Sequence, residues 1–139
     1  MNQSVMFKLS YGLFILTAKE NGFDNGSVIN TAQQLTDSPN RISVTVNKNG
    51  KTHDMIKNTG AFNISVLSEE ADFDLIKHFG FQSGADCDKF DGYKNAKRGE
   101  NGIMYITKGI NSYISANVIQ EIDLGTHTLF IADVTDGEM

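Results

Sequence analysis

The sequence predicts a mainly β fold: a closed or partly closed antiparallel barrel of about seven strands with two short helices. Three observations favour this class. Apolar and polar residues alternate in several short segments, turn-forming Gly and Asn residues separate these segments, and no internal repeat divides the chain. A chain of 139 residues can bury a sufficient core without disulfides, so we expect one domain over residues 1–139.

The N-terminal half supplies the first strands. Residues 11–18 (YGLFILTA) are predicted to be an interior strand, because no basic segment precedes them as in a secretory signal. The NG pairs at residues 21–22 and 25–26 are strong turn signals, so a hairpin should follow. Residues 27–36 are then expected to be extended and rich in amides and hydroxyls, and residues 41–47 (RISVTVN) form the next strand.

Two short helices are predicted in the middle of the chain. Thr52 is a suitable N-cap for the helix HDMIKNT, and Gly60 stands where a helix-terminating glycine is common. The strand AFNISVL follows. A second helix is predicted from Ser68 to Gly80, with three apolar residues on its buried face: Phe73, Ile76 and Phe79.

The C-terminal half begins with a long polar connection. Residues 81–101 follow no helical or strand period, and such a length is typical of a functional or mobile segment. The segments GIMYITKG, SYISANVIQEIDL and THTLFIADV then alternate as three more strands.

Composition limits the partners and the compartment. The net charge of −5, from 12 basic and 17 acidic residues, disfavours nucleic acid and anionic membranes. No apolar run approaches the roughly 20 residues of a membrane span. The lone Cys87 cannot form an internal disulfide, which fits a reducing compartment, so the cytoplasm is the expected location.

Several catalytic and ligand motifs are excluded. Gly50-Lys51-Thr52 is not a P-loop, because Thr45 stands where the first glycine is required, and no G-x-G-x-x-G is present. The histidines at 53, 78 and 127 lack ligand spacing, so no metal site is predicted. Cys87 lies between two aspartates, which raise the pKa of a thiol and disfavour a nucleophile.

The stretch NTAQQLTDSP, residues 30–39, is the most informative one. Its amides and hydroxyls either form a solvated strand face or lie along a bound ligand, since amides both donate and accept hydrogen bonds. The basic pair Lys48 and Lys51 follows one strand later and could hold one small anion.

Four motifs in order carry a family resemblance. INTAQQLTDSP, ISVTVNKNGKTHDMIKNTGAFNISVL, FGFQSGADCDKF and GTHTLFIADV resemble the flavin reductase-like family of FMN-binding split barrels, over residues 11–134. The branch indicated contains flavoredoxins and rubredoxin-type flavin reductases. The resemblance implies a Greek-key split β-barrel with two or three short helices, FMN as the cofactor, NAD(P)H as the electron donor, and a homodimer with flavin at its interface.

The resemblance also assigns residues. Asn47, Lys48 and Thr52 would hold the 5′-phosphate at a helix N-terminus, where free N–H groups favour anions. The ribityl chain and ring edge would lie beside a polar segment: Asn30, Thr31, Ala32, Gln33, Gln34 and Thr36. The loop from residue 81 to 89 would contact the flavin from the partner subunit, through Phe81, Ser83 and Lys89. His127 would lie on the nicotinamide side, or else be a half-exposed turn residue.

The implied function is an NAD(P)H:flavin oxidoreductase or a flavoredoxin-like electron carrier with a redox partner protein. The alternatives are a flavin-binding module without turnover, and a haem or pyridoxal-phosphate protein of a related barrel. Ala85 and Thr126 depart from the family pattern, in which a basic and an acidic residue are common there. The sequence ends shortly after Val134, where similar proteins usually continue, which fits a truncated or short form.

Overall fold

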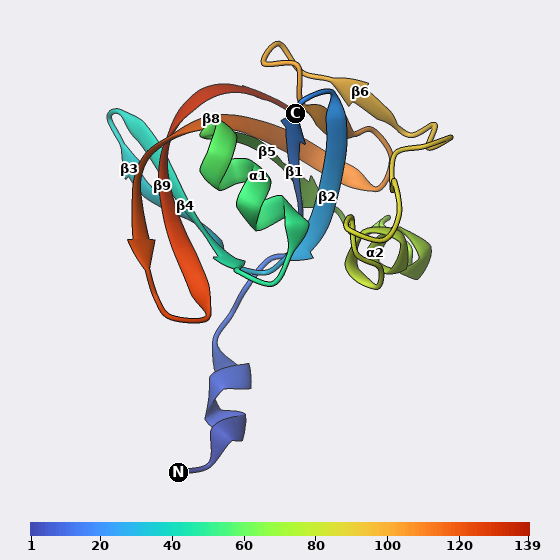
Figure 1. Cartoon of the computed structure of the whole chain (residues 1–139). Coiled ribbons are helices and arrows are strands. Elements are labelled where there is room, and N and C mark those ends of the chain that lie inside the picture. The colour runs from blue at the N-terminus through green and yellow to red at the C-terminus, as the bar shows by residue number, and fades with distance from the viewer.

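The computed structural model describes all 139 residues, which form a curved antiparallel sheet with three short helices (Figure 1). In chain order the elements are the 3₁₀ helix η1 (Gln3–Lys8), β1 (Phe14–Glu20), β2 (Phe23–Ile29), β3 (Ala32–Asp37), β4 (Asn40–Asn47), α1 (Lys51–Thr59), β5 (Ala61–Leu67), α2 (Phe73–Gly80), β6 (Ala96–Arg98), β7 (Met104–Ile106), β8 (Ile110–Asp123) and β9 (His127–Glu138). The prediction of a mainly β, antiparallel fold is confirmed.

The main sheet has the strand order β2-β1-β5-β8-β9-β4-β3. β5, β8 and β9 follow one another across the sheet, and the earlier strand β4 lies beside β9, which is a Greek-key order. β2 and β3 are the two edges, so hydrogen bonds do not close the sheet into a ring. The fold is therefore the partly closed form of the predicted barrel.

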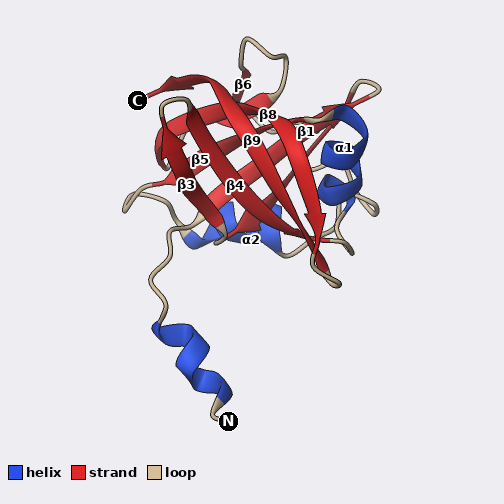
Figure 2. Ribbon diagram, turned by 90° about the vertical axis from the view of Figure 1, so that its left-hand side faces the viewer, coloured by secondary structure: helices blue, strands red, loops and turns tan.

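The main core lies inside the curve of this sheet (Figure 2). Apolar side chains of β1, β4, β5, β8 and β9 meet there, and α1 adds Met55 and Ile56. α1 lies between the β1–β2 side and the β3–β4 side of the sheet (Figure 1). The core therefore fixes the position of α1, and with it the first turn of that helix.

A second core cluster joins β1 to α2 and the polar connection. Its buried members are Ile15, Leu75, Phe79, Phe90 and Ile106. The prediction that Phe79 belongs to the core is confirmed, but Phe73 is 61% exposed and Leu75 takes the buried position instead. The buried face of α2 is thus formed by Leu75 and Phe79, and Phe73 does not belong to it.

Both faces of β5 are covered, which alternation alone did not predict. Phe62 and Ile64 point into the main core as expected. On the other face Asn63 and Ser65 are fully buried beneath the β6–β7 hairpin. The Asn63 amide donates to the Ile103 carbonyl at 3.0 Å, and Ser65 Oγ accepts from the Ile106 amide at 3.0 Å.

The first hairpin, β1–β2, has one of the two turns that its NG pairs predict. Asn21 and Gly22 have left-handed φ angles of 51° and 79°, so the turn predicted there is confirmed. The turn predicted at residues 25–26 is wrong, because both residues lie inside β2. A Cβ added to Gly26 would lie 3.1 Å from the Phe79 ring, so this glycine allows close packing of α2 rather than a turn.

Three further boundaries differ from the predictions. The extended segment 27–36 is interrupted at residues 30–31, between β2 and β3. The connection 81–101 contains the short strand β6, so the chain has nine strands rather than about seven. α2 begins after Asp72, whose side chain accepts from the Leu75 amide, and not near Ser68.

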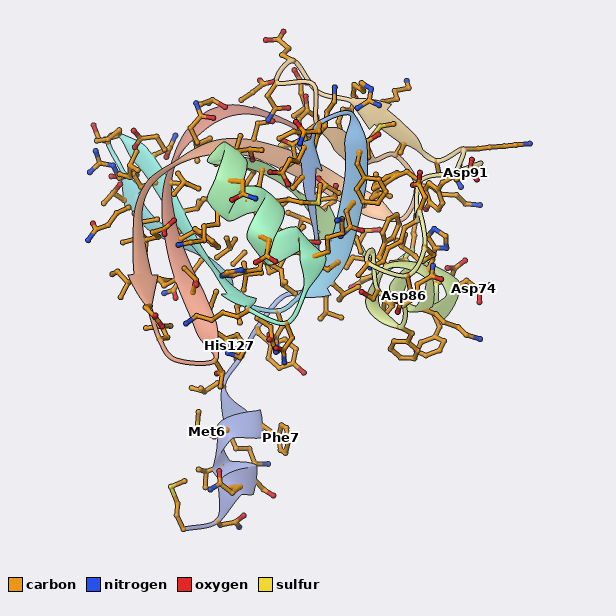
Figure 3. The ribbon with its side chains drawn as sticks, viewed as in Figure 1. Met6, Phe7, Asp74, Asp86, Asp91 and His127 are labelled. Atoms are coloured by element: carbon orange, nitrogen blue, oxygen red, sulfur yellow. The ribbon has the colours of Figure 1, made fainter.

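The N-terminal segment, residues 1–13, projects away from the sheet (Figure 1). We call it the arm. None of its η1 residues is buried, and its apolar side chains are exposed: Val5, Met6, Phe7 and Leu9. Figure 3 shows Met6 and Phe7 on the arm, away from the rest of the chain. No helix in the structure has the length and apolar character needed to cross a membrane.

Candidate functional site

A polar cavity of about 450 Å³ lies at the N-terminus of α1. We call it the α1 cavity. Five parts of the chain line it: β2, the end of β4, the first turn of α1, the end of α2 with the loop after it, and Lys89. Five of the residues predicted as flavin contacts are brought together here: Asn47, Thr52, Phe81, Ser83 and Lys89.

The first turn of α1 presents free backbone donors. Its N-cap is Gly50, with φ −87° and ψ 144°, and no side chain accepts a hydrogen bond from the turn. The prediction of Thr52 as the N-cap is therefore wrong, whereas Gly60 ends the helix in the left-handed conformation as predicted. An α-helix leaves its first N–H groups without intrahelical partners, and these groups attract anions.

Thr52 is the second residue of α1, in its first turn, and its side chain is held from β2. Asn25 Nδ2 donates to Thr52 Oγ1 at 2.9 Å, and both residues are buried. Asn25 Oδ1 is also buried, and no group in the chain donates to it. Gly84 covers this amide, because a Cβ added there would lie 2.4 Å from both Oδ1 and Nδ2.

Lys89 lines the α1 cavity on the side where α2 ends. Its ammonium donates to the carbonyl oxygens of Gly26 at 2.7 Å and Phe79 at 2.8 Å. Burial lowers the pKa of Lys89, and the nearby Cys87 partly opposes this effect. These contacts tie β2 to the end of α2, so Lys89 supports the wall of the cavity as well as lining it.

The loop after α2 is ordered by its own hydrogen bonds. The Ser83 carbonyl accepts from the amides of Asp86 and Cys87, and Ser83 Oγ accepts from the Ala85 amide. Phe81 is exposed and meets Phe73 edge-to-face at 5.5 Å. Within one chain this loop already lies against the first turn of α1.

Lys48 does not line the α1 cavity. Its ammonium forms an ion pair with Asp123 Oδ1 at 2.6 Å. The hydrogen bond from Lys48 lowers the pKa of Asp123, and the Gly125 amide adds to the effect. A phosphate contact by Lys48 therefore requires its side chain to leave Asp123.

The polar segment 30–36 lies along another surface. Ala32, Gln33 and Gln34 line a mostly apolar cavity of about 380 Å³ with core-facing residues of β4, β5 and β8. The hydroxyl of Thr31 donates to the Thr45 carbonyl at 2.7 Å. Two hydrogen bonds hold the end of β3: Gln34 Nε2 donates to the Thr36 carbonyl at 3.2 Å, and Thr36 Oγ1 donates to that of Pro39. Asn30 is exposed between β2 and β3.

The segment nevertheless starts beside the α1 cavity. Ser27 and Val28 of β2 line that cavity, and Asn30 follows two residues later. Thr45, which binds Thr31, precedes Asn47 by two residues on β4. The Thr31–Thr45 hydrogen bond therefore lies between the α1 cavity and β3.

His127 begins β9 at the tip of the β8–β9 hairpin (Figure 3). It pairs with Asn47 across β4 and β9, and its Nδ1 shares a hydrogen bond with Thr126 Oγ1 at 2.8 Å. The side chain is half-buried. His127 thus lies next to a residue that lines the α1 cavity.

Three contributors to the site were not predicted as such: Asn25, Gly50 and Gly84. The sequence predicts Asn25 as a turn residue, and Gly50 belongs to the Gly-Lys-Thr triplet that is not a P-loop. The signal available for Gly50 was a glycine directly before a short helix, where a residue with a capping side chain is more usual. Nothing local in the sequence marks Gly84.

Comparisons with known proteins place this geometry in a class. Over residues 6–139 the chain matches the family described as "Flavin reductase like domain". A ferric-chelate reductase (NAD(P)H) of Archaeoglobus fulgidus is 40% identical over 139 residues, covering 100% of this chain and 82% of that protein. A high molecular weight rubredoxin of Moorella thermoacetica is 43% identical over 136 residues, covering 98% of this chain and 59% of that protein.

A solved structure agrees with these relatives. The flavin reductase PheA2 in its native state superimposes with a TM-score of 0.82 at 25% identity, covering 99% of this chain and 84% of that chain. The fold and these relatives thus define a flavin-binding oxidoreductase, of the flavin reductase or electron-transfer kind. The chain belongs to the flavin reductase-like family, which confirms the resemblance carried by its motifs.

Proposed function

We propose that this protein is an NAD(P)H:flavin oxidoreductase that uses FMN and binds its 5′-phosphate in the α1 cavity. The observation that carries the proposal is the open N-terminus of α1, which combines free N–H groups with the buried Thr52 hydroxyl. A terminal phosphate is a dianion that only accepts hydrogen bonds, so it matches this set of donors. Residues 1–139 would act as one flavin-binding domain.

The residues present fit the cofactor in a second respect. Asn47, Thr31 and Gln33 offer amides, a hydroxyl and main-chain groups between the α1 cavity and the start of β3. Such groups can bind the hydroxyls of a ribityl chain and the polar edge of the flavin ring. Bound flavin would accept hydride from a nicotinamide and pass electrons to an acceptor.

The protein's own residues would then bind and orient. Asn47 and Thr52 fix the phosphate end, and main-chain donors near Gln33 and Gln34 stabilise negative charge at the ring edge. His127 stands on the nicotinamide side, next to Asn47. No side chain in this arrangement needs to act as a nucleophile.

We also propose a homodimer with flavin at its interface. The arm supports this, because its apolar side chains have no partner within the chain (Figures 1 and 3). Phe73 and Phe81 add an exposed aromatic pair close to the α1 cavity. Light scattering of the flavin-loaded protein should give a dimer, and a monomer would refute the proposal.

A cytoplasmic location is proposed from the single free cysteine. A separate redox protein is proposed as the electron acceptor, in keeping with the rubredoxin name of one relative.

One set of spectra tests the function. The purified protein should show a flavin absorbance spectrum, and NADH or NADPH should bleach it under anaerobic conditions. His127→Ala should slow the bleaching while flavin content stays unchanged. If dithionite bleaches the flavin and neither nucleotide does, the protein is an electron carrier without hydride transfer. A haem or pyridoxal-phosphate spectrum would exclude the cofactor assignment itself.

A further inference from the structure

We infer that Asn25 is a positioning residue for the anion in the α1 cavity: its amide fixes the Thr52 hydroxyl as a donor to a phosphate monoester. The inference rests on the proposed phosphate site. It adds a residue that lines the same cavity but is distant in the sequence from the other proposed phosphate contacts. Asn25 lies on β2, 27 positions before Thr52.

The contact between the two side chains is buried and direct. Asn25 Nδ2 lies 2.9 Å from Thr52 Oγ1, with the two residues 1% and 2% exposed. An amide NH₂ group only donates, so Thr52 Oγ1 is the acceptor in this bond. The lone pair that receives it is no longer available, and the hydroxyl proton must point elsewhere.

Elsewhere in the helix, Thr59 Oγ1 donates to the Met55 carbonyl at 2.8 Å, four residues earlier, as helical threonines often do. Thr52 is the second residue of α1, and the residue four positions before it, Lys48, precedes the helix. Thr52 makes no such bond, and its hydroxyl donates to no acceptor in the chain. The proton of a buried hydroxyl that lines the α1 cavity is therefore available to a ligand.

The ligand must accept hydrogen bonds at this point. The free N–H groups of the first turn of α1 and the Thr52 hydroxyl are all donors, and Gly50 adds no competing side-chain acceptor. Phosphate oxygens only accept, and charge strengthens each bond they receive. A phosphate monoester meets these requirements, whereas an uncharged hydroxyl group would leave most of the donors weakly paired.

Asn25 Oδ1 gives an independent sign that the side chain is held for this purpose. It is buried without a donor, although buried polar groups are nearly always paired. Gly84 covers the amide so closely that a Cβ there would come within 2.4 Å of it. The chain thus tolerates an unpaired oxygen in order to keep an amide against Thr52.

The test is a double-mutant cycle with Asn25→Leu and Thr52→Val, which keep side-chain shape and remove the polar atoms. Titration calorimetry measures FMN and riboflavin binding to each variant and to the wild-type protein. Thr52→Val should weaken FMN about tenfold, as expected for one hydrogen bond to a charged group. Asn25→Leu should weaken FMN in the same direction, at least about threefold, since the hydroxyl is then free to rotate.

The cycle separates positioning from support of the fold. The double variant should bind FMN no more weakly than Thr52→Val alone, because Asn25 acts through Thr52. Riboflavin, which lacks the phosphate, should bind equally to all four proteins. Thr52→Ser keeps the hydroxyl, so it should retain FMN affinity and stay sensitive to Asn25→Leu. Flavin-free, the double variant should unfold at an unchanged or higher temperature, because both partners of the buried bond and the unpaired Asn25 oxygen are gone.

Each other outcome overturns a defined claim. Additive losses, or equal losses for FMN and riboflavin, would show that Asn25 supports the fold and does not orient Thr52. A preference for FMN over riboflavin that is undiminished in Asn25→Leu and Thr52→Val would overturn the inference and leave the flavin function standing. If the wild-type protein binds no flavin, both the inference and the proposed function are wrong.

Discussion

The two α-helices of this chain begin in opposite ways. α2 is closed by its own sequence, since Asp72 Oδ1 accepts from the Leu75 amide at 3.0 Å. α1 begins at Gly50, which offers no side-chain acceptor, and its first turn faces a polar cavity. Both helices start with N–H groups that need partners. The cap of α2 contributes to stability, and the uncapped start of α1 agrees with the proposal that a phosphate binds there.

The largest expected effect comes from closing α1 in the way that α2 is closed. Gly50→Asp fits without strain, because a Cβ there meets only the Asn47 carbonyl at 3.6 Å. The new carboxylate should cap the first turn and repel phosphate. We expect FMN affinity to fall about 100-fold, the equivalent of two lost hydrogen bonds to a charged group.

The flavin-free Gly50→Asp protein should unfold at a higher temperature, as a capped helix does. Calorimetry gives the affinity and thermal unfolding gives the stability. Gly50→Ser is the matched control, with a cap but no charge, and should lose less affinity. Unchanged FMN binding in Gly50→Asp would show that the start of α1 is not the phosphate site.

A smaller change tests the charge beside α1. Lys48→Ala should weaken FMN about tenfold and leave riboflavin unaffected, if the ammonium leaves Asp123 for the phosphate. Asp123→Asn should have the opposite effect. Exposed ion pairs are worth about 0.2–1 kcal/mol, so releasing Lys48 should tighten FMN by at most about fivefold.

The Asp123→Asn effect should vanish when Lys48 is already alanine, which fluorescence titration of the double variant would reveal. Equal weakening of FMN and riboflavin by Lys48→Ala would instead assign Lys48 to the fold. Together these measurements decide whether the first turn of α1 binds the phosphate alone or together with the Lys48 ammonium, which lies outside the cavity.

The counterpart experiment removes the cap of α2. Asp72→Ala should cost about 1 kcal/mol of unfolding free energy, because the Leu75 amide loses its acceptor. FMN affinity should not change, since Asp72 does not line the α1 cavity. Urea unfolding and FMN titration check the two halves of this prediction, and a loss of affinity would contradict the division of roles between the helices.

The smallest effect is a pH dependence of the Lys48–Asp123 pair. Lys48 holds the pKa of Asp123 below its ordinary value of 3.8. The pair therefore stabilises the fold above that value, and the contribution disappears as the pH falls through the lowered pKa. The stability difference between wild type and Asp123→Asn should be present at pH 7 and should shrink as the pH is lowered below 3.8, which unfolding curves at a series of pH values would measure.

The sequence predicted where the two helices lie more accurately than it predicted the residue at which each helix begins. Periodicity and Gly60 located α1, but Thr52 looked like a cap because its real partner, Asn25, comes from another strand. A contact over 27 positions leaves no local pattern. The same holds for Gly26, which looked like a turn and instead lets α2 approach β2.

The candidate site was predictable in part. The resemblance predicted one site for Asn47, Thr52 and Ser83, and the three residues line the same cavity, while their contact with flavin stays a prediction. The ion pair of Lys48 with Asp123 was not predictable, since it depends on how the β8–β9 hairpin folds back beside β4. The Thr52–Asn25 contact, the packing at Gly26 and the Lys48–Asp123 ion pair all join segments that are distant in the sequence, so local patterns could not predict them.

The exposed arm has a consequence for the colloidal behaviour of the protein. It exposes four apolar side chains, which favour association with neighbouring molecules unless a partner covers them: Val5, Met6, Phe7 and Leu9. At pH 7 the net charge of −5 keeps molecules apart by repulsion. This repulsion disappears near the isoelectric point of about 5.0, so the protein should precipitate in mildly acidic buffers, and a chain without residues 1–9 should stay in solution there.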